Sequence, residues 1–546
     1  MNKIAQYLNE HILGEVNCDD KVREKFSHDG SILRITPELV VHPRVTNDIR
    51  KVARFCWQLA EKGHVLPITV RGGGSDKSGA AIGKGIIINT IAHLDKTIFI
   101  SHKNKDQFVH VQPGVNCKAL NETLKSHAMI IPSLMASSAF NTVGGAVANN
   151  SGNSLSGRYG LVSDWVKRLE IVLANGDLIE TNRINKHELN KKKGLQTFEG
   201  EIYRKIDGII EDNKQVILDK IANISPDNTG YTGIAKVKER DGSFDLTPLI
   251  IGSQGTLGIM SEIVIKTDYY SIDEFILVAV FDNAETARDA ADSMVSLRPT
   301  ELEIFDGKMF DMAHELGKKY IFSEIYLNKN VGTVLYISFN DIGNHIRHKK
   351  IKQTLKKLSK FETTTFTNAD YSVDELHMIH EVSSVLSYTN TKDETRPSII
   401  DGVSVPATRR EEFIVAVSEL ADKHHIKLPL HIQWLDGVVL TKPTLNLHVI
   451  SDKQKTFKLI SDYMELVIGL GGSMAANSGE GRLRATAAYS QLDKDEIDIY
   501  TQIRSAFDPF GTLNPGVKQM SDLKTLISNL NPDYSPADFS MYSPVD

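Results

Sequence analysis

Strand-like and helix-like spacings of apolar residues alternate over the first half of the chain. Short apolar runs such as Val65–Val70 are typical of buried strands. One helical segment begins after Thr46 or Asn47, either of which can cap it. Its apolar residues recur with helical spacing: Ile49, Val52, Ala53, Cys56, Leu59 and Ala60. Two further apolar runs flank Asn175-Gly176, a dipeptide that favours a hairpin turn. The pattern predicts alternating strands and helices over Val40–Thr267.

The spacing of apolar residues along the chain changes near Tyr270, where longer strands and helices are expected to begin. Strands are expected at Phe275–Phe281, Glu301–Phe305, Thr333–Phe339 and Thr444–Ile450. Helices are expected at Ala284–Val295, His345–Lys360, Glu411–His424 and Lys453–Leu470. Helices that are segregated on a mainly antiparallel sheet indicate an α+β second domain.

Composition and charge narrow the class of protein. The 546 residues include 63 basic and 69 acidic side chains, and the net charge of −6 argues against a nucleic-acid-binding protein. Apolar residues make up 41% of the chain, which is ordinary for globular proteins and excludes wholesale disorder. The length predicts about two to four domains, each able to bury its own core.

Cysteine usage and hydropathy indicate the compartment. The three cysteines, Cys18, Cys56 and Cys117, are too few and too scattered for a disulfide framework or a C-x-x-C metal site, which favours a reducing compartment. Met1–Val16 lacks the apolar core of a secretory signal, and the longest strongly apolar run, Phe275–Phe281, is too short to span a bilayer. We therefore expect a cytoplasmic protein that at most contacts the inner face of a membrane.

The 38 glycines are close to an average number, but many of them gather in four segments. These are Val70–Gly83, Thr142–Gly152 with the following Tyr159-Gly160, Ile251–Ile259 and Phe507–Gly516. Consecutive glycines let main-chain N–H groups approach phosphate oxygens. The first segment does not open a helix as a Rossmann fingerprint does, and it lacks the spacing of a P-loop. Each segment alone is equally consistent with an ordinary turn, whereas the four together point to a bound dinucleotide.

On these segments the chain resembles the FAD-linked oxidases of the vanillyl-alcohol-oxidase/PCMH fold, in the D-lactate dehydrogenase (cytochrome) and glycolate oxidase branch. The family loop R-G-G-G-T-S/D-x-x-G is matched by Arg71–Gly79, and T-I-G-G-x-x-A-x-N-A-G by Thr142–Gly152. G-S-E-G-T-L-G-I is matched by Gly252–Ile259, with Gln254 in place of Glu. F-D-P-x-G-x-L-N-P-G-K is matched by Phe507–Gly516, with Lys518 one residue late.

The resemblance implies an α+β fold in which an antiparallel cap interrupts a PCMH-type FAD-binding domain built from two α/β subdomains. The expected parts are a helical lead-in at 1–35, the FAD-binding domain at 36–270, the cap at 271–470, a C-terminal segment at 471–520 that completes the flavin site, and a tail at 521–546. The residues implied to bind FAD are Pro43, Arg71, Gly72, Gly73, Gly74, Ser75, Asp76, Gly79, Ser137, Thr142, Gly144, Gly145, Ala148, Asn149, Gly152, Tyr159, Gly160, Gly255, Gly258, Ile259 and Asn514.

The resemblance also implies that FAD is held without a covalent bond. Covalent relatives carry a histidine in the first glycine loop, where this chain has Ser75-Asp76. No cysteine lies near the second glycine segment in the sequence.

The motifs that bind the metal and the substrate in this family are altered in this chain. Relatives bind a metal through G-H-x-G-D-x-N-x-H and G-E-H-(N/G)-x-G, and a cap arginine binds the substrate carboxylate. Here Gln433 and Leu440 replace two metal-binding histidines, the second motif keeps only Glu480, and His380 replaces the arginine. Because leucine cannot bind a cation, we expect no catalytic metal. A shifted alignment would instead recruit Asn446-Leu447-His448.

The polar candidates that remain for substrate chemistry are Glu480, Arg482, Arg484, His380 and His448. Of these, Glu480, Arg482 and His380 are the predicted catalytic residues. The alternatives are structural ion pairs for the two arginines, a supporting or helix-terminal carboxylate for Glu480, and structural or exposed positions for the histidines.

The leading hypothesis is an FAD-dependent oxidoreductase that oxidises a D-2-hydroxy acid, such as D-lactate or glycolate, by hydride transfer to flavin N5. A quinone, a cytochrome or another electron-transfer protein would then accept the electrons. The alternative is a flavin-binding regulatory or structural subunit without this activity. An unrelated nucleotide-binding enzyme is a third reading, which retention of NAD rather than FAD would distinguish. The sequence leaves the oligomeric state open.

Overall fold

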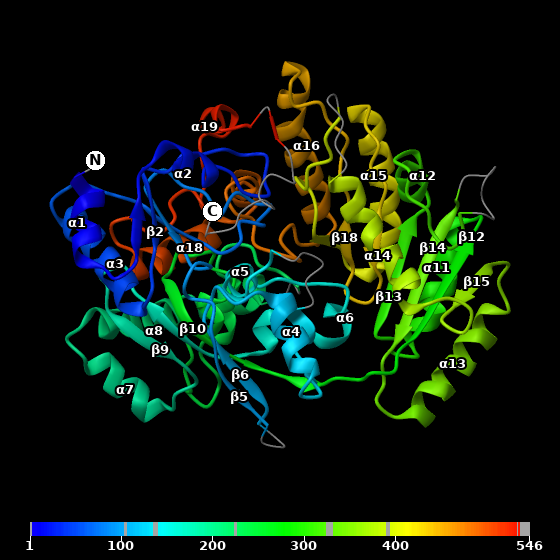
Figure 1. Cartoon of the computed structure of the whole chain (residues 1–546), viewed down its shortest axis with the longest axis horizontal. Coiled ribbons are helices and arrows are strands. Elements are labelled where there is room, and N and C mark those ends of the chain that lie inside the picture. The colour runs from blue at the N-terminus through cyan, green and yellow to red at the C-terminus, as the bar shows by residue number, and fades with distance from the viewer. Residues whose placement is uncertain are drawn as a thin grey trace.

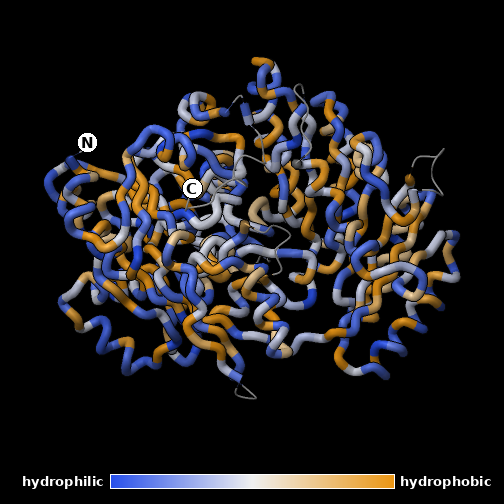
Figure 2. Tube along the Cα trace, in the orientation of Figure 1, coloured by the Kyte–Doolittle hydropathy of each residue, from blue (hydrophilic) through white to orange (hydrophobic). Residues whose placement is uncertain are grey.

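The computed structural model describes residues 3–102, 106–134, 140–222, 226–323, 331–388, 394–531 and 533–534. Two halves lie side by side (Figure 1), with the N-terminal part and the last helices in one half and a cap formed by residues 275–469 in the other. Figure 2 shows apolar residues concentrated in the sheets of both halves.

The first half contains two main sheets. The four-stranded sheet has the order β1-β2-β4-β3: β1 (Glu15–Asn17), β2 (Leu39–His42), β4 (Ile86–Asn89) and β3 (Ile68–Arg71). Strands β2, β4 and β3 are parallel, and β2 and β4 are buried along their whole length. Burial on both faces explains why these strands are continuous apolar runs rather than alternating ones.

The second sheet of this half is antiparallel and five-stranded. Its order is β5 (Thr97–Ser101), β6 (Phe108–Val111), β10 (Ile259–Lys266), β8 (Val166–Val172) and β9 (Leu178–Thr181). The Asn175-Gly176 turn joins β8 to β9, so the expected hairpin is confirmed. A two-stranded sheet pairs β11 (Asp268–Tyr269) with β7 (Met129–Ile130).

Helices surround these sheets. They are α1 (Lys3–His11), α2 (Asp20–Lys25), α3 (Thr46–Glu61), α4 (Cys117–Lys125), α5 (Val143–Asn149), α6 (Ser156–Tyr159), α7 (Lys186–Gly194), α8 (Phe198–Asp212), α9 (Lys214–Val216) and α10 (Thr247–Ile250). Short helical turns are η1 (Pro132–Leu134), η2 (Val162–Asp164), η3 (Ile217–Ile221) and η4 (Thr232–Lys236).

The cap is a seven-stranded antiparallel sheet with helices on both faces. Its order is β15 (Thr364–Thr367), β12 (Phe275–Phe281), β14 (Thr333–Phe339), β13 (Glu301–Asp306), β17 (His431–Gln433), β18 (Val438–Leu440) and β16 (Val403–Ser404). Its helices are α11 (Ala284–Val295), α12 (Lys308–Glu315), α13 (Asn344–Leu358), α14 (Val373–Tyr388), η5 (Ala407–Arg409), α15 (Arg410–His424) and α16 (Ile450–Gly469).

Successive side chains along β12 belong to two different hydrophobic cores. Ile276, Val278 and Val280 belong to the core that α12 and α14 share, whereas Leu277 and Ala279 belong to the core that α11 shares. Because successive strand residues point to opposite faces, one strand packs against both helix layers. Helix α14 is thereby held against one face of the cap sheet.

After the cap, the chain returns to the first half. Helices α17 (Ala485–Tyr489), α18 (Lys494–Phe507) and α19 (Leu523–Ser528) lie there. Leu513 pairs with Ile68 of β3, and Leu530 pairs with Leu33. The first half is therefore closed by residues that are distant in sequence.

The α+β fold class is confirmed, but one expected strand is wrong. Thr444–Ile450 forms only a single bridge at Leu445 and then a turn. Asn446 Oδ1 accepts a hydrogen bond from the His448 N–H, and Asp452 accepts one from the Asn446 N–H. These side-chain bonds favour a turn that leads into α16. Among the described helices, none combines the length and apolar character needed to cross a bilayer.

Candidate active site

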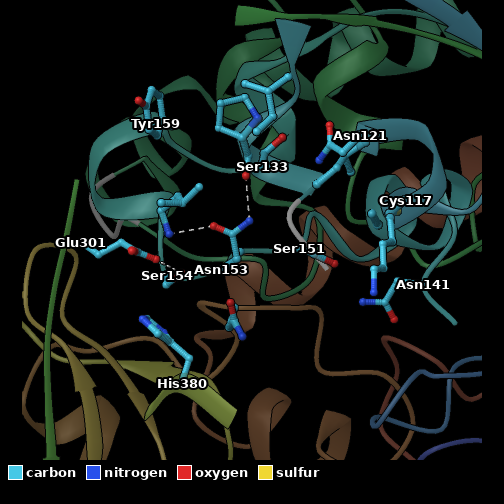
Figure 3. A pocket seen from close by; sticks show the side chains of 18 of the residues that line it. Cys117, Asn121, Ser133, Asn141, Ser151, Asn153, Ser154, Tyr159, Glu301 and His380 are labelled. Atoms are coloured by element: carbon cyan, nitrogen blue, oxygen red, sulfur yellow. Dashed lines mark hydrogen bonds between the residues drawn. The ribbon is translucent and has the colours of Figure 1, made fainter. Parts of the chain in front are cut away.

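A cavity of about 1770 Å³ lies between the two halves. The first two glycine segments and part of the third line it on one side, and residues of β13, α14, β17 and β18 line it on the other. Figure 3 shows Glu301 and His380 of the cap approaching Asn153 and Ser154 of the first half. The Ser154 hydroxyl donates a hydrogen bond to Glu301 across the boundary, with an O–O distance of 2.6 Å.

The first glycine loop follows β3 and is too tightly packed for side chains. A Cβ added at Gly73 would lie 2.0 Å from the Phe140 carbonyl oxygen, and one at Gly72 would lie 2.2 Å from Thr142 Oγ1. Gly74 has a φ of +77°, which favours glycine. Within the described residues, the N–H groups of Gly73, Gly74 and Ser75 have no hydrogen-bond partner. This exposed main chain fits an anionic group such as a phosphate.

The glycine segments are joined by a polar network. Asp76 accepts hydrogen bonds from the Ser78 and Ala80 N–H groups and from the Asn149 side chain. Gln254 donates to Asn149 Oδ1 over 2.7 Å and accepts from the Gly481 N–H over 2.9 Å. Gln254, which replaces the Glu of the family motif, thus connects the second and third segments to the C-terminal part of the chain.

Most of the expected FAD-binding residues line the cavity. These are Gly72, Gly73, Gly74, Ser75, Asp76, Thr142, Gly144, Gly145, Ala148, Asn149, Gly152, Tyr159, Gly255 and Gly258. Those outside its lining are Pro43, Arg71, Gly79, Gly160, Ile259 and Asn514. Ser137 lies outside the described residues.

Two of the residues outside the lining support the loop from behind. Arg71 is almost fully buried and donates to the His28 carbonyl over 2.7 Å. Asn514 donates to the carbonyls of Ala80 and Gln254, each over 2.8 Å. Both residues therefore fix main chain next to the cavity rather than face it.

One cysteine is nearer the second glycine segment than the sequence order suggests. Cys117 lines the cavity, and its N–H donates to the Asn141 carbonyl over 2.9 Å. Burial raises the pKa of its thiol to about 12. Because the thiolate is the reactive form, this cysteine is a poor nucleophile at neutral pH.

Two of the three predicted catalytic residues lie outside the lining of the cavity. Glu480 and Lys518 form a fully buried ion pair with an N–O distance of 2.7 Å. Arg482 donates to the carbonyls of Gly79, Ile82 and Pro515. Arg484 likewise donates to carbonyls, those of Asp401, Met474 and Gly479. All of these side chains join the C-terminal segment to neighbouring main chain.

The third predicted residue, His380, does line the cavity. Its Nδ1 lies 3.0 Å from Glu303 Oε2, and His431 Nε2 lies 3.2 Å from the same oxygen. Glu303 is fully buried on β13. One carboxylate is therefore placed between two imidazole rings that both face the cavity.

Electrostatics of this cluster follow from burial and opposite charge. Burial alone would raise the pKa of Glu303, but the adjacent His380 and His431 outweigh it and hold that pKa well below its usual range. Burial also opposes the charged form of His380, yet Glu303, Glu301 and Glu274 together raise its pKa to about 9. His380 is thus a cation at neutral pH.

Glu303 and His431 were not predicted from the sequence as residues of the site. His431 is two residues before Gln433 on β17, so alternation places the two side chains on the same face of the strand. Glu303 was part of the expected strand Glu301–Phe305, and the available signal was a pair of glutamates, Glu301 and Glu303, on one face of that strand. His448, by contrast, is exposed and is absent from the cavity lining.

Gln433, Leu440 and Lys442 line the cavity near these histidines. Lys442 donates to Ser383 Oγ over 2.8 Å, and burial lowers its pKa to about 8. No group of three or more His, Cys, Asp or Glu side chains in the described part of the chain is placed to hold a metal ion. The expected absence of a catalytic metal stays a prediction.

The first half is completed by chain segments on both sides of the antiparallel cap, and the two parts enclose a glycine-lined cavity. The sequence family described as an FAD binding domain matches residues 37–182, and the one described as the C-terminal domain of FAD linked oxidases matches residues 273–517. The chain belongs to the FAD-linked oxidases. The expected FAD cofactor is confirmed by the match to an FAD binding domain.

Relatives of this chain are about a quarter identical to it over the aligned residues. A D-2-hydroxyglutarate dehydrogenase of Pantoea ananatis is 25% identical, over 90% of this chain and 49% of its own length. The glycolate oxidase subunit GlcD of Bacillus subtilis is 24% identical, over 92% of this chain and 94% of its own. A D-lactate dehydrogenase of Archaeoglobus fulgidus is 23% identical, over 88% and 90%. The chain spans about half the length of the D-2-hydroxyglutarate dehydrogenases that it matches.

Solved structures share the fold. A 4-ethylphenol oxidase from Gulosibacter chungangensis has a TM-score of 0.67 at 15% identity, covering 96% of this chain and 98% of its own. An alkyldihydroxyacetonephosphate synthase has a TM-score of 0.62 at 15% identity, covering 94% and 86%. At this identity the likeness concerns the fold alone.

Proposed function

We propose that this protein oxidises a 2-hydroxy acid of the D-lactate or glycolate type, with FAD as the first electron acceptor. One observation carries the proposal: the imidazole pair around Glu303 lines the same cavity as the bare glycine loop. The names of the relatives, which act on D-2-hydroxyglutarate, glycolate or D-lactate, support this substrate class.

The residues for FAD are those of the glycine-lined side. The N–H groups of Gly73, Gly74 and Ser75 would hold the phosphates, and the small residues of α5 and its flanks would lie against the flavin. Bound FAD would supply an acceptor for a hydride from the substrate carbon. The chain's own residues bind the acid, exclude water from the cavity and accept the hydroxyl proton.

His380 and His431 are the residues that would contact the substrate. His380 Nε2, both ring nitrogens of His431 and both carboxylate oxygens of Glu303 are buried and have no hydrogen-bond partner among the described residues. Buried polar atoms are normally hydrogen-bonded, so these atoms await a partner that enters the cavity. Glu480 and Arg482, whose hydrogen bonds are satisfied within the chain, would stabilise the fold instead.

Anaerobic mixing with D- and L-hydroxy acids tests the proposal. We expect at least one D-2-hydroxy acid to bleach the flavin absorbance, and pretreatment with a chelator to leave the rate unchanged, because no metal ion is needed. Bleaching by no hydroxy acid would favour a flavin-binding subunit without this activity. Bleaching that the chelator abolishes would overturn the metal-free site.

We further propose that FAD is bound non-covalently. Acid precipitation should release all of the flavin into the supernatant, and Cys117→Ser should retain as much FAD as the unmodified protein, since the thiol remains protonated. The measurement is flavin absorbance in supernatant and pellet. Yellow pellets from the unmodified protein and colourless pellets from Cys117→Ser would reveal a thioether.

The electrons would pass to an acceptor such as a quinone, a cytochrome or an electron-transfer protein, in keeping with one relative named as a cytochrome-linked D-lactate dehydrogenase. A cytoplasmic location, with contact to a membrane surface as an option, is part of the same proposal. Anaerobic reoxidation of the reduced flavin by each class of acceptor would rank these partners.

A further inference from the structure

We infer that helix α13 and the linker at 270–274 form a docking surface for an anionic lipid bilayer. This docking surface combines basic and apolar side chains that are exposed to solvent: Ile272, Ile342, Ile346, Lys349, Lys352 and Lys356. The inference goes beyond the proposed function and does not depend on it, because lipid binding requires neither a hydroxy acid nor an electron acceptor.

Basic residues are concentrated in this segment of the chain. Residues 342–361 include six lysines and one arginine but no aspartate or glutamate, although the whole chain has a net charge of −6. Lys349, Lys352 and Lys356 are three and four residues apart on α13, so they share one face of the helix. All three are exposed, and none forms an ion pair within the described residues. This face therefore presents a positive charge to solvent.

Two other basic residues of α13 are already paired inside the protein. Arg347 is buried and donates to Asp273 of the linker over 2.9 Å. Lys350 Nζ lies 2.9 Å from a carboxylate oxygen of Asp341, which precedes the helix. Because these two carboxylates have their own partners, they do not cancel the charge of the three exposed lysines.

Three isoleucines beside the lysines are exposed although they are strongly apolar. The exposed fractions are 86% for Ile272, 65% for Ile342 and 55% for Ile346. The bond between Arg347 and Asp273 brings the linker next to the first turns of α13. A Cβ added at Gly343 would lie 3.4 Å from Ile346 Cδ1, so this side chain reaches back toward the start of the helix. Exposed apolar side chains that gather in this way mark interaction surfaces.

The docking surface surrounds a place where the large cavity reaches the outside of the protein. The three exposed isoleucines also belong to the cavity lining. In the view of Figure 1, the linker and α13 lie along the lower side of the molecule, whereas α15 and α16 lie on the upper side. Docking through α13 would therefore turn this opening of the cavity toward the lipid.

The combination of side chains favours a bilayer over an acidic protein. Lysines along a helix attract anionic head groups, and apolar side chains on the same surface insert at the boundary between head groups and acyl chains. Tyr269, which precedes the linker, is 52% exposed, and tyrosine is common at membrane interfaces. An acidic protein would pair with the lysines, but its charged groups would leave the isoleucines without an apolar partner.

Flotation of the FAD-loaded protein with vesicles tests the inference. Vesicles of equimolar phosphatidylcholine and phosphatidylglycerol are compared with vesicles of phosphatidylcholine alone, and flavin absorbance measures the floated protein and confirms that each variant is folded. We expect binding to the anionic vesicles only. Raising the salt from about 0.1 M to about 1 M shortens the Debye length from about 10 Å to about 3 Å, which should weaken the binding at least 5-fold.

Two sets of substitutions separate the contributions of charge and apolar contact. Lys349→Glu, Lys352→Glu and Lys356→Glu together should weaken vesicle binding at least 10-fold, because each lysine near an anionic surface contributes to the attraction. Ile342→Asn with Ile346→Asn should weaken it at least 5-fold, because less apolar surface is buried.

Matched controls change exposed residues outside the docking surface. Lys427→Glu, Lys458→Glu and Lys494→Glu together reverse the same number of charges, and Val415→Asn removes an apolar side chain of α15 that is 60% exposed. Both controls should float with anionic vesicles nearly as well as the unmodified protein.

Equal binding to neutral and anionic vesicles would overturn the inference, as would full binding by the lysine variant or by the isoleucine variant. Poly-L-glutamate is the probe for the other kind of partner. If it binds through the three lysines while anionic vesicles do not bind, the surface belongs to an acidic protein and the inference fails. None of these results depends on whether a hydroxy acid bleaches the flavin, so failure of the proposed function is recognised separately.

Discussion

Gly73→Ala is expected to weaken FAD binding by about 5- to 150-fold, corresponding to about 1–3 kcal/mol of overpacking. The added Cβ would lie 2.0 Å from the Phe140 carbonyl oxygen, so the loop must move away from its neighbour. The same loop carries the N–H groups of Gly74 and Ser75 that face the proposed phosphate position. Their displacement removes hydrogen bonds to a charged group, which are among the stronger ones.

Fluorescence titration of the stripped protein with FAD measures this effect. Gly208→Ala is a matched control, because Gly208 lies within α8 and a Cβ there meets nothing within 4 Å. That variant should bind FAD normally and be more stable by about 0.5–1 kcal/mol. If Gly73→Ala bound FAD as tightly as the control, the loop would not be the phosphate site.

Lys518→Met is expected to lower the free energy of unfolding by about 3–5 kcal/mol, because it leaves Glu480 as a buried, unpaired carboxylate. Lys518 Nζ also donates to the carbonyls of Asn228 and Gly230, at 2.7 and 2.8 Å. The substitution therefore disconnects the C-terminal segment from the loop at 228–230. Urea denaturation followed by tryptophan fluorescence gives the free energy.

Two further variants test the cause. Glu480→Leu with Lys518→Met should recover part of the loss, since it removes the buried charge while the Asn228 and Gly230 carbonyls stay unpaired. Lys220→Met removes a surface pair with Asp493, in which both side chains are partly exposed, and should cost no more than about 1 kcal/mol. If Lys518→Met lowered the free energy of unfolding as little as Lys220→Met, the buried ion pair would not be important for stability.

The cofactor half could be predicted from sequence because its requirements are local. A phosphate-binding loop needs glycines at consecutive positions, and the first glycine segment does line the cavity. The strands Phe275–Phe281 and Thr333–Phe339 were predicted to the residue, since long apolar runs leave little choice of structure. The Thr444–Ile450 strand was wrong because Asn446 and Asp452 offer the main chain a competing turn.

The substrate half could not be predicted in the same way. Glu303, His380 and His431 come from β13, α14 and β17, and their convergence depends on the pairing of β13 with β17. No spacing in the sequence encodes that contact. Glu480 was a candidate because it matched a motif position, but its role follows from Lys518, which is 38 residues away.

The return of the chain to β3 determines how late in synthesis the structure around the first glycine loop can be completed. Ile68 accepts a hydrogen bond from Asn514 and donates one to the Thr512 carbonyl. Residues 512–514, which pair with Ile68 of β3, are therefore synthesised only after the whole cap. Since domains tend to fold as units during synthesis, the cap can fold while the glycine loop is still open. Nascent chains that end before residue 513 should thus be unable to retain FAD, which makes cofactor capture a late event in biosynthesis.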